Sequence, residues 1–163
     1  MVDLPRSSAI KGICESHIKA SLNSASMSTY AAIESVLARH TASVIYAEAE
    51  AIIRDLVAQR VAYGTTDTRV KSFSQVASQR LIRSIKISEL SGVLNHFSPV
   101  CKEYFSRSLT SKQQTDWDSL INSRHDAAHE NSGSIEHLTL ADIDGYFASI
   151  PAVLDAFSES LNR

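Results

Sequence analysis

The longest helical pattern in the chain is STYAAIESVLARHTASVIYAEAEAIIRDLVAQRVAYG, residues 28–64. It contains no proline, and no glycine before Gly64, and its apolar residues recur every three or four positions, which predicts an α-helix from about Ser28 to Tyr63. Its apolar residues fall into two stripes, one with Ile33, Leu37, Val44, Ala47 and Ala51 and one with Ile45, Ile52 and Leu56. Two stripes predict contacts on two sides, either within one bundle or with a second subunit.

The rest of the chain has the same helical character, because proline occurs only at positions 5, 99 and 151 and glycine only five times. Further helices are expected from about 5 into the Ser-rich stretch 21–28, at about 70–85, 87–96 and 98–109, from about 110–111 into the motif, and from 139 towards the end. We therefore predict an all-α fold, an up-and-down helical bundle of about five to six helices with a long second helix. At 163 residues, one domain over 1–163 is long enough to bury a core.

The last predicted helix carries its own start and kink signals. Thr139 with Asp142 three residues on is a plausible capping box, in which each side chain bonds the other residue's backbone N–H. Pro151 lies inside the pattern and removes the hydrogen bond to the Phe147 carbonyl, which predicts a kink near Phe147 to Ile150.

Composition excludes several classes of protein. Cys14 and Cys101 are too few for a disulfide framework or a cysteine metal cage and are expected to be core residues in a reducing compartment. The start of the sequence lacks a signal pattern and no apolar run approaches the ~20 residues that span a bilayer, so we expect a cytoplasmic protein with no membrane partner. With 16 basic and 18 acidic residues, the net charge of −2 argues against binding nucleic acid by bulk electrostatics.

One stretch is nevertheless basic, because no Asp or Glu occurs from Arg69 to Ser88. Its bases are Arg69, Lys71, Arg80, Arg83 and Lys86. They are candidates for guiding RNA phosphates, and the alternative is a solvated helix face whose long stems cover apolar surface.

The segment Arg124-His125-Asp126-Ala127-Ala128-His129 places a guanidinium group and an imidazole close together in a helical pattern. Guanidinium binds phosphate through two hydrogen bonds and stabilises its charge, while imidazole exchanges protons near neutral pH. Arg124 and His129 are therefore the predicted catalytic pair for RNA cleavage. His125 and Asp126 are predicted to support them.

Helical geometry leaves the environment of Arg124 open. Trp117, Ile121 and Arg124 share one narrow stripe at about 100° per residue, so Arg124 stands where an apolar residue is expected. It either pairs with a buried carboxylate such as Glu50 or opens onto a cleft that binds phosphate. His129 lies about 140° round the helix from Arg124, so the two share a face only if the helix distorts or two subunits combine their residues.

The motif resembles the signature of the HEPN superfamily, in which an Arg is followed within a few residues by a His and a polar residue, here His125, follows the Arg. The resemblance extends to Tyr46-Ala47-Glu48-Ala49-Glu50 and to Leu138-Thr139-Leu140-Ala141-Asp142-Ile143, and is closest to the RiboL-PSP and MAE-type branches. It implies a metal-independent endoribonuclease that needs no cofactor and acts as a homodimer with a composite site. It also implies a toxin or phage-defence effector restrained by an antitoxin or regulatory partner protein.

Two other interpretations remain open. His125 and His129 are four residues apart, a spacing that suits one metal ion, with oxygens from Asp126 or Glu130 and a further imidazole from His137, His40 or His96. The pattern lacks the Glu directly after the first His that a zinc-peptidase helix requires. The other interpretation is a noncatalytic HEPN dimerisation or binding module.

Overall fold

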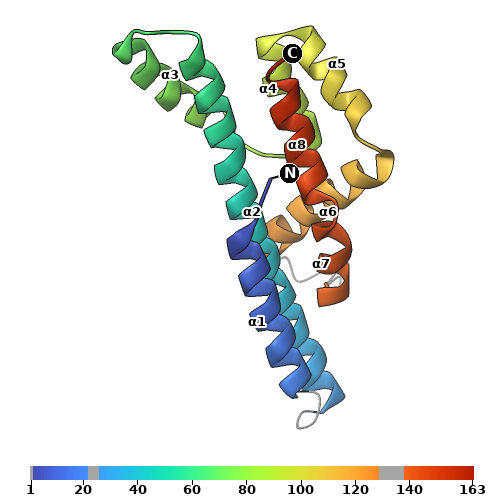
Figure 1. Ribbon diagram of the computed structural model, residues 1–163. Helices are drawn as coiled ribbons and strands as arrows, with labels where there is room; N and C mark the ends of the chain where they lie inside the picture. The colour runs from blue at the N-terminus through green and yellow to red at the C-terminus, as the bar shows by residue number, and fades with distance from the viewer. Residues whose placement is uncertain (1, 22–25, 129–137) are drawn as a thin grey trace.

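The computed structural model describes residues 2–21, 26–128 and 138–163, with the backbone alone for Gln79, Leu81 and residues 124–128. Within these ranges the chain forms α-helices and no strand, which confirms the all-α class (Figure 1). The helices are α1 Pro5–Ser21, α2 Met27–Tyr63, α3 Thr68–Leu81, α4 Ile87–Phe97, α5 Pro99–Ser108, α6 Ser111–Ala128, α7 Leu140–Phe147 and α8 Ile150–Ser160. The described part thus has eight helices, more than the predicted five to six; every expected helical segment is present, and the last one is divided into α7 and α8.

Helix α2 is the central helix of the bundle and confirms the predicted long second helix. It begins after Ser26, whose side chain accepts a hydrogen bond from the Thr29 N–H, and it ends at Gly64. Figure 1 shows α1 beside the lower half of α2 and α3 folded back beside its upper end. Helices α6, α7 and α8 pack on α2 between them, so α2 connects the two ends of the molecule.

The buried face of α2 is lined largely by small side chains. Ala38, Ala42 and Ala49 are almost fully buried, and Thr41 is buried beside them. Small side chains let neighbouring helices approach closely, which gives α2 several partners along its length. Larger side chains, including Ile45 and Ile53, complete this face.

Both predicted stripes of α2 contact the core, but one of them ends at exposed positions. Ile45 is buried, and Ile52 and Leu56 pack on the core. The other stripe begins with half-buried Ile33 and Leu37 and ends at alanines that are exposed, Ala47 and Ala51. Contacts of this stripe with a second subunit stay a prediction.

The upper part of the core joins α5 to α8. The rings of Phe105 and Phe157 meet edge to face, with centroids 6.0 Å apart, and both side chains are fully buried. Outside them the Tyr104 hydroxyl donates to a Glu159 carboxylate oxygen at 2.8 Å. Cys101 on α5 and Cys14 on α1 are free and buried, as expected of core residues.

The expected helix at 70–85 is too long, because α3 ends at Leu81. Residue Ile82 is extended, with φ −84° and ψ 91°, and the side chains of Ile82 and Ile85 are buried. Their carbonyl oxygens accept hydrogen bonds from the side chains of Arg54 and Trp117. Tertiary hydrogen bonds therefore satisfy these backbone carbonyl groups, which in a helix would accept hydrogen bonds within the helix.

The predicted kink near Pro151 is a full interruption between α7 and α8 at Ala148 and Ser149. Pro151 lies in the first turn of α8, where its missing N–H costs no intrahelical bond. The capping box at the start of α7 is confirmed: the Thr139 side chain accepts from the Asp142 N–H, and the Asp142 carboxylate accepts from the Thr139 N–H.

Candidate functional site

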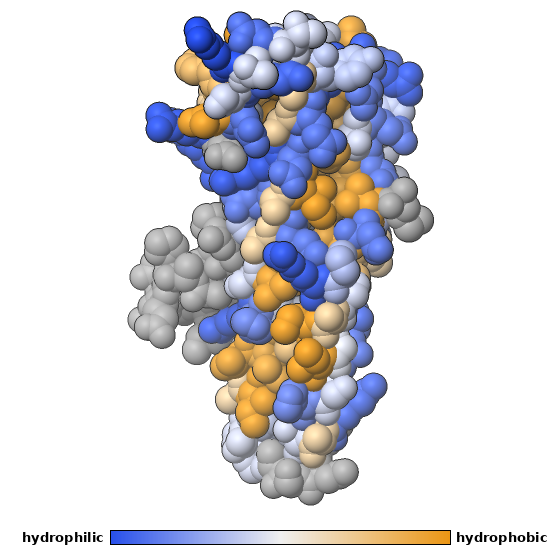
Figure 2. Space-filling model, turned by 60° about the vertical axis from the view of Figure 1, so that its left-hand side comes forward, coloured by the Kyte–Doolittle hydropathy of each residue, from blue (hydrophilic) through white to orange (hydrophobic). Residues whose placement is uncertain are grey.

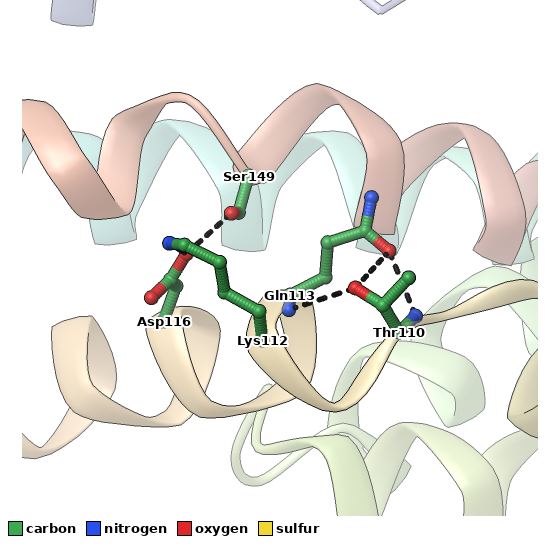
Figure 3. A network of polar contacts seen from close by, with 5 residues as sticks. All are labelled: Thr110, Lys112, Gln113, Asp116 and Ser149. Atoms are coloured by element: carbon green, nitrogen blue, oxygen red, sulfur yellow. Dashed lines mark hydrogen bonds and ion pairs between the residues drawn. The ribbon is translucent and has the colours of Figure 1, made fainter.

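Helix α6 carries the predicted motif, and its first turn is capped by its own residues. The Gln113 side-chain oxygen accepts hydrogen bonds from the Thr110 N–H at 2.9 Å and the Thr110 hydroxyl at 3.1 Å. The Gln113 N–H in turn donates to the Thr110 hydroxyl oxygen at 3.3 Å (Figure 3). These reciprocal bonds satisfy N–H groups that have no partner within the helix and confirm that it starts near Thr110 and Ser111.

Two long-range hydrogen bonds attach α6 to the segment before α4. The indole N–H of fully buried Trp117 donates to the Ile85 carbonyl at 2.6 Å. The next residue, Asp118, accepts from the Ile87 N–H at 3.0 Å, at the first turn of α4. The neighbouring side chains Leu120 and Ile121 are fully buried, so this half of α6 is held on several sides.

A buried polar contact attaches α6 to the break between α7 and α8. The Ser149 hydroxyl and the Lys112 ammonium both donate to Asp116 Oδ2, each at 2.6 Å (Figure 3). Burial disfavours the ionised form of Asp116, but these two hydrogen bonds outweigh that effect and lower the pKa of the carboxyl below its usual value. Asp116 is therefore held as a carboxylate that joins two elements and fixes the direction of α6.

The predicted catalytic residues lie at the other end of α6, where the structure describes only part of them. The backbones of Arg124, His125 and Asp126 belong to the last turns of α6, and their side chains lie outside the described residues. His129, the residue directly after α6, lies wholly outside them, as does the remainder of the metal interpretation at Glu130 and His137. The approach of Arg124 to His129 therefore stays a prediction.

The carboxylate considered as a partner for Arg124 has another partner. Glu50 Oε1 lies 3.1 Å from Nη2 of Arg54, one turn on in α2. Nη2 of Arg54 also donates to the Ile82 carbonyl at 3.4 Å. Glu50 is therefore paired with Arg54, and whether it also meets Arg124 lies outside the described residues.

Helix α7, the next described helix after the motif, contacts α2. The Leu140 N–H at the start of α7 donates to Glu34 Oε1 at 3.4 Å, and α6 and α7 both pack on α2. In Figure 1, α6 reaches α2 near its middle and α7 lies below that point.

The five predicted RNA-binding bases lie elsewhere, around α3. Arg69, Lys71 and Arg80 are exposed on α3, Arg83 is exposed just after it, and Lys86 is half-buried. Figure 1 places α3 beside the upper end of α2, whereas α6 reaches α2 near its middle. An RNA would have to extend over both regions to touch the bases and the motif, and this role stays a prediction.

Sequence reasoning missed an apolar groove beside those bases. It is bounded by α2, α3 and α4 and encloses about 240 Å³. Figure 2 shows hydrophobic side chains reaching the surface between hydrophilic ones in the upper half of the molecule, and more extensively over the α1–α2 hairpin below. A signal was present, because Val70, Phe73 and Val76 recur every three residues within the basic stretch.

The described part of the chain contains no group of three or more His, Cys, Asp and Glu residues placed to hold a metal ion. Over the same residues, no helix has the length and apolar character needed to cross a membrane. No protein-family model, curated protein or solved structure matches the chain.

Proposed function

We propose that this chain is a metal-independent endoribonuclease whose catalytic pair is Arg124 and His129. The observation that carries the proposal is their sequence: a guanidinium and an imidazole separated by four residues, with the backbone of Arg124 on α6. The resemblance of this motif and its surroundings to the HEPN superfamily supports it. The all-helical fold with a long second helix agrees with that resemblance.

The proposed reaction is attack of a ribose 2′-hydroxyl on the adjacent phosphorus. The new O2′–P bond forms as the P–O5′ bond breaks, leaving a 2′,3′-cyclic phosphate and a 5′-hydroxyl. His129 takes the proton from the 2′-hydroxyl as general base or gives one to the leaving 5′-oxygen as general acid. Arg124 binds the phosphate and stabilises the charge that develops on it. His125 positions the substrate or assists proton transfer, and Asp126 orients a neighbouring His or Arg.

The anchoring of α6 supports this role for its end. Trp117 and Asp118 bind the segment at Ile85 and Ile87, and Asp116 binds Ser149 between α7 and α8, so the last turns of α6 extend from a part of the helix that is held at two places. Catalytic side chains are best positioned on rigid elements. Because Arg124 and His129 point about 140° apart on a regular helix, we propose that two copies of the chain form a homodimer in which each His works with the partner's Arg.

The context we propose is a cytoplasmic toxin or antiviral defence protein that acts on RNA and is restrained by an antitoxin or another regulatory partner. Support for this context comes only from the family resemblance. A nuclease acting on cellular RNA needs such restraint, because its substrate is always present.

The test is cleavage of a structured RNA pool in excess EDTA by the wild type, Arg124→Ala and His129→Ala. The matched controls are Arg107→Ala on α5 and His17→Ala on α1, which remove the same side chains from exposed positions. We expect cleavage by the wild type and both controls, cyclic phosphate ends, and a loss of about 100-fold or more in each motif variant. DNA of the same sequence should resist, because it lacks the 2′-hydroxyl.

Other outcomes would change the conclusion. Activity that disappears in EDTA and returns with zinc or manganese would favour the His125 and His129 metal site. Cleavage that persists in both motif variants would reject the assigned pair. Full absence of cleavage, with dimerisation retained, would favour a noncatalytic binding module.

A further inference from the structure

The apolar groove between α2, α3 and α4 is built from side chains of all three helices. Val57 and Val61 come from α2, Phe73 and Ala77 from α3, and Val93 and Phe97 from α4. The floor is closed, since Val57 is 3% exposed and Ile82 at the end of α3 is 2% exposed. The groove is therefore a recess between helices.

Helix α3 forms one wall of this groove and has few contacts with the bundle. It packs mainly on α2 (Figure 1). Three of its apolar side chains remain exposed, Val70 by 45%, Phe73 by 76% and Val76 by 49%, and Phe97 on the opposite wall is 37% exposed. A cluster of large apolar side chains around a recess is a feature of interaction sites.

The rims of the groove are positively charged on both sides of α3. At about 100° per residue, Arg80 lies about 20° from Phe73, and Lys71 lies about 20° from Ser78 on the other edge of the apolar face. Arg69 and Arg83 are also exposed, and no acidic residue occurs between positions 69 and 88. The nearest preceding acid, Asp67, caps α3 through the Arg69 N–H at 2.8 Å.

We propose that this groove is the docking site for an amphipathic α-helix of a partner protein, with an apolar stripe flanked by Asp and Glu. Such a helix places residues i, i+3, i+4 and i+7 in the groove and its carboxylates beside the bases of α3. Charge complementarity selects an acidic helix over a basic one. The proposal does not depend on the proposed nuclease activity.

Two other occupants fit less well. A lipid bilayer covers protruding side chains, but it does not fill a recess whose floor lies between three helices. RNA would use the bases but would leave the aliphatic walls, such as Val57, Val61 and Val93, without suitable contacts. A helix uses both features, because its apolar side chains enter the recess and its flanks meet the rim.

The experiment uses the full chain and a fluorescein-labelled synthetic peptide of about 18 residues, or about five helical turns. Its apolar face carries Leu at i, i+3, i+4 and i+7, and Glu flanks that face. A second peptide has the same Leu residues with Lys in place of Glu. Binding is measured by fluorescence anisotropy for the wild type, Phe73→Ser and Arg80→Glu, and amide shifts in the wild type locate the bound peptide.

The controls are Ile13→Ser and Lys19→Glu on α1, which change an exposed apolar and an exposed basic side chain at the other end of the molecule. We expect the acidic peptide to bind the wild type and both controls and to shift amides of α3 and α4. Phe73→Ser should weaken it about tenfold or more. Arg80→Glu should weaken the acidic peptide and strengthen the Lys peptide. Circular dichroism confirms that each variant remains folded.

Several results would overturn the proposal: no binding of the acidic peptide, equal binding of both peptides, or binding unaffected by Phe73→Ser. Self-association that depends on Phe73, measured by light scattering, would assign the groove to a second copy of the chain. Phe73-dependent binding of an RNA oligonucleotide or of phosphatidylglycerol vesicles, with none of the peptide, would assign it to RNA or to lipid.

Discussion

The indole nitrogen of Trp117 donates a hydrogen bond to the carbonyl oxygen of Ile85, 2.6 Å away and 32 residues earlier in the chain. Both residues are fully buried, and the bond closes the non-helical segment between α3 and α4 against α6. One side chain thus links α6 to the segment that follows α3.

Trp117→Phe should lower the free energy of unfolding by about 1 to 3 kcal/mol, because the Ile85 carbonyl loses its donor while the ring position stays apolar. Urea denaturation followed by circular dichroism measures this, since the substitution removes the chain's one tryptophan fluorophore. The matched control is Tyr63→Phe at a side chain that is 90% exposed, where a change within about 0.5 kcal/mol is expected. Equal effects in the two variants would show that the Trp117 bond contributes nothing.

The two side chains that donate to Asp116 should contribute different amounts to the free energy of unfolding. Ser149→Ala removes a buried hydrogen bond to a carboxylate and should cost about 1.5 to 3 kcal/mol of unfolding free energy. Lys112→Ala should cost less than about 1 kcal/mol, because the Lys112 side chain is 75% exposed. Denaturant unfolding of both single variants and the double variant measures each effect and their coupling. A larger loss for Lys112→Ala would contradict the assignment.

Much of the fold follows from local signals in the sequence. Pro5 lies at the start of α1, and Thr139 with Asp142 begins α7, because each of these residues acts on its immediate backbone. Local signals fail where distant side chains bind the backbone. The pattern at 70–85 looks helical throughout, yet the carbonyls of Ile82 and Ile85 accept from Arg54 and Trp117, which no local pattern reveals.

The two candidate sites also differ in whether a local sequence pattern reveals them. The motif from Arg124 to His129 is visible in the sequence because both groups lie within six consecutive residues. The groove was missed because its walls come from three helices, with Val57, Phe73 and Val93 far apart in the chain. The basic stretch predicts either a surface for phosphate or a solvated helix face whose long side chains cover apolar surface, and only the packing of α3 shows the apolar recess beside it.

Glu48 should make the stability of α1 depend on pH. Its carboxylate accepts from the Arg6 N–H at 3.1 Å, the Ser7 N–H at 2.8 Å and the Ser7 hydroxyl at 2.6 Å, so a residue of α2 caps the first turn of α1. Burial of Glu48 raises its pKa, but these hydrogen bonds outweigh it and the net pKa lies below the ordinary 4.5. Glu48→Gln should cost about 1 to 2 kcal/mol of unfolding free energy at neutral pH.

The sign of the pH effect follows from that lowered pKa. The contribution of Glu48 is complete above the ordinary pKa of 4.5 and is lost as the pH falls below it, through the lower pKa of the folded state. The difference in unfolding free energy between the wild type and Glu48→Gln should therefore narrow as the pH falls below 4.5. Asp55→Asn, at an exposed position of the same helix, is the control and should show little difference at any pH. A gap that widens on acidification would contradict this prediction.

Mixing two inactive variants should restore part of the activity if the site is shared between subunits. Arg124→Ala retains His129, and His129→Ala retains Arg124, so a mixed dimer holds one complete composite site and one site that lacks both groups. We expect partial recovery of RNA cleavage in EDTA after the variants are mixed and allowed to exchange subunits, with dimer formation followed by light scattering. Mixtures of either variant with Arg124→Ala/His129→Ala are the matched control and should stay inactive, because no combination supplies both groups to one site. If instead the wild type cleaves RNA as a strict monomer, Arg124 and His129 must act within one chain. Because a straight helix separates the two side chains by about 140°, the backbone near Arg124 would then have to depart from regular helical geometry.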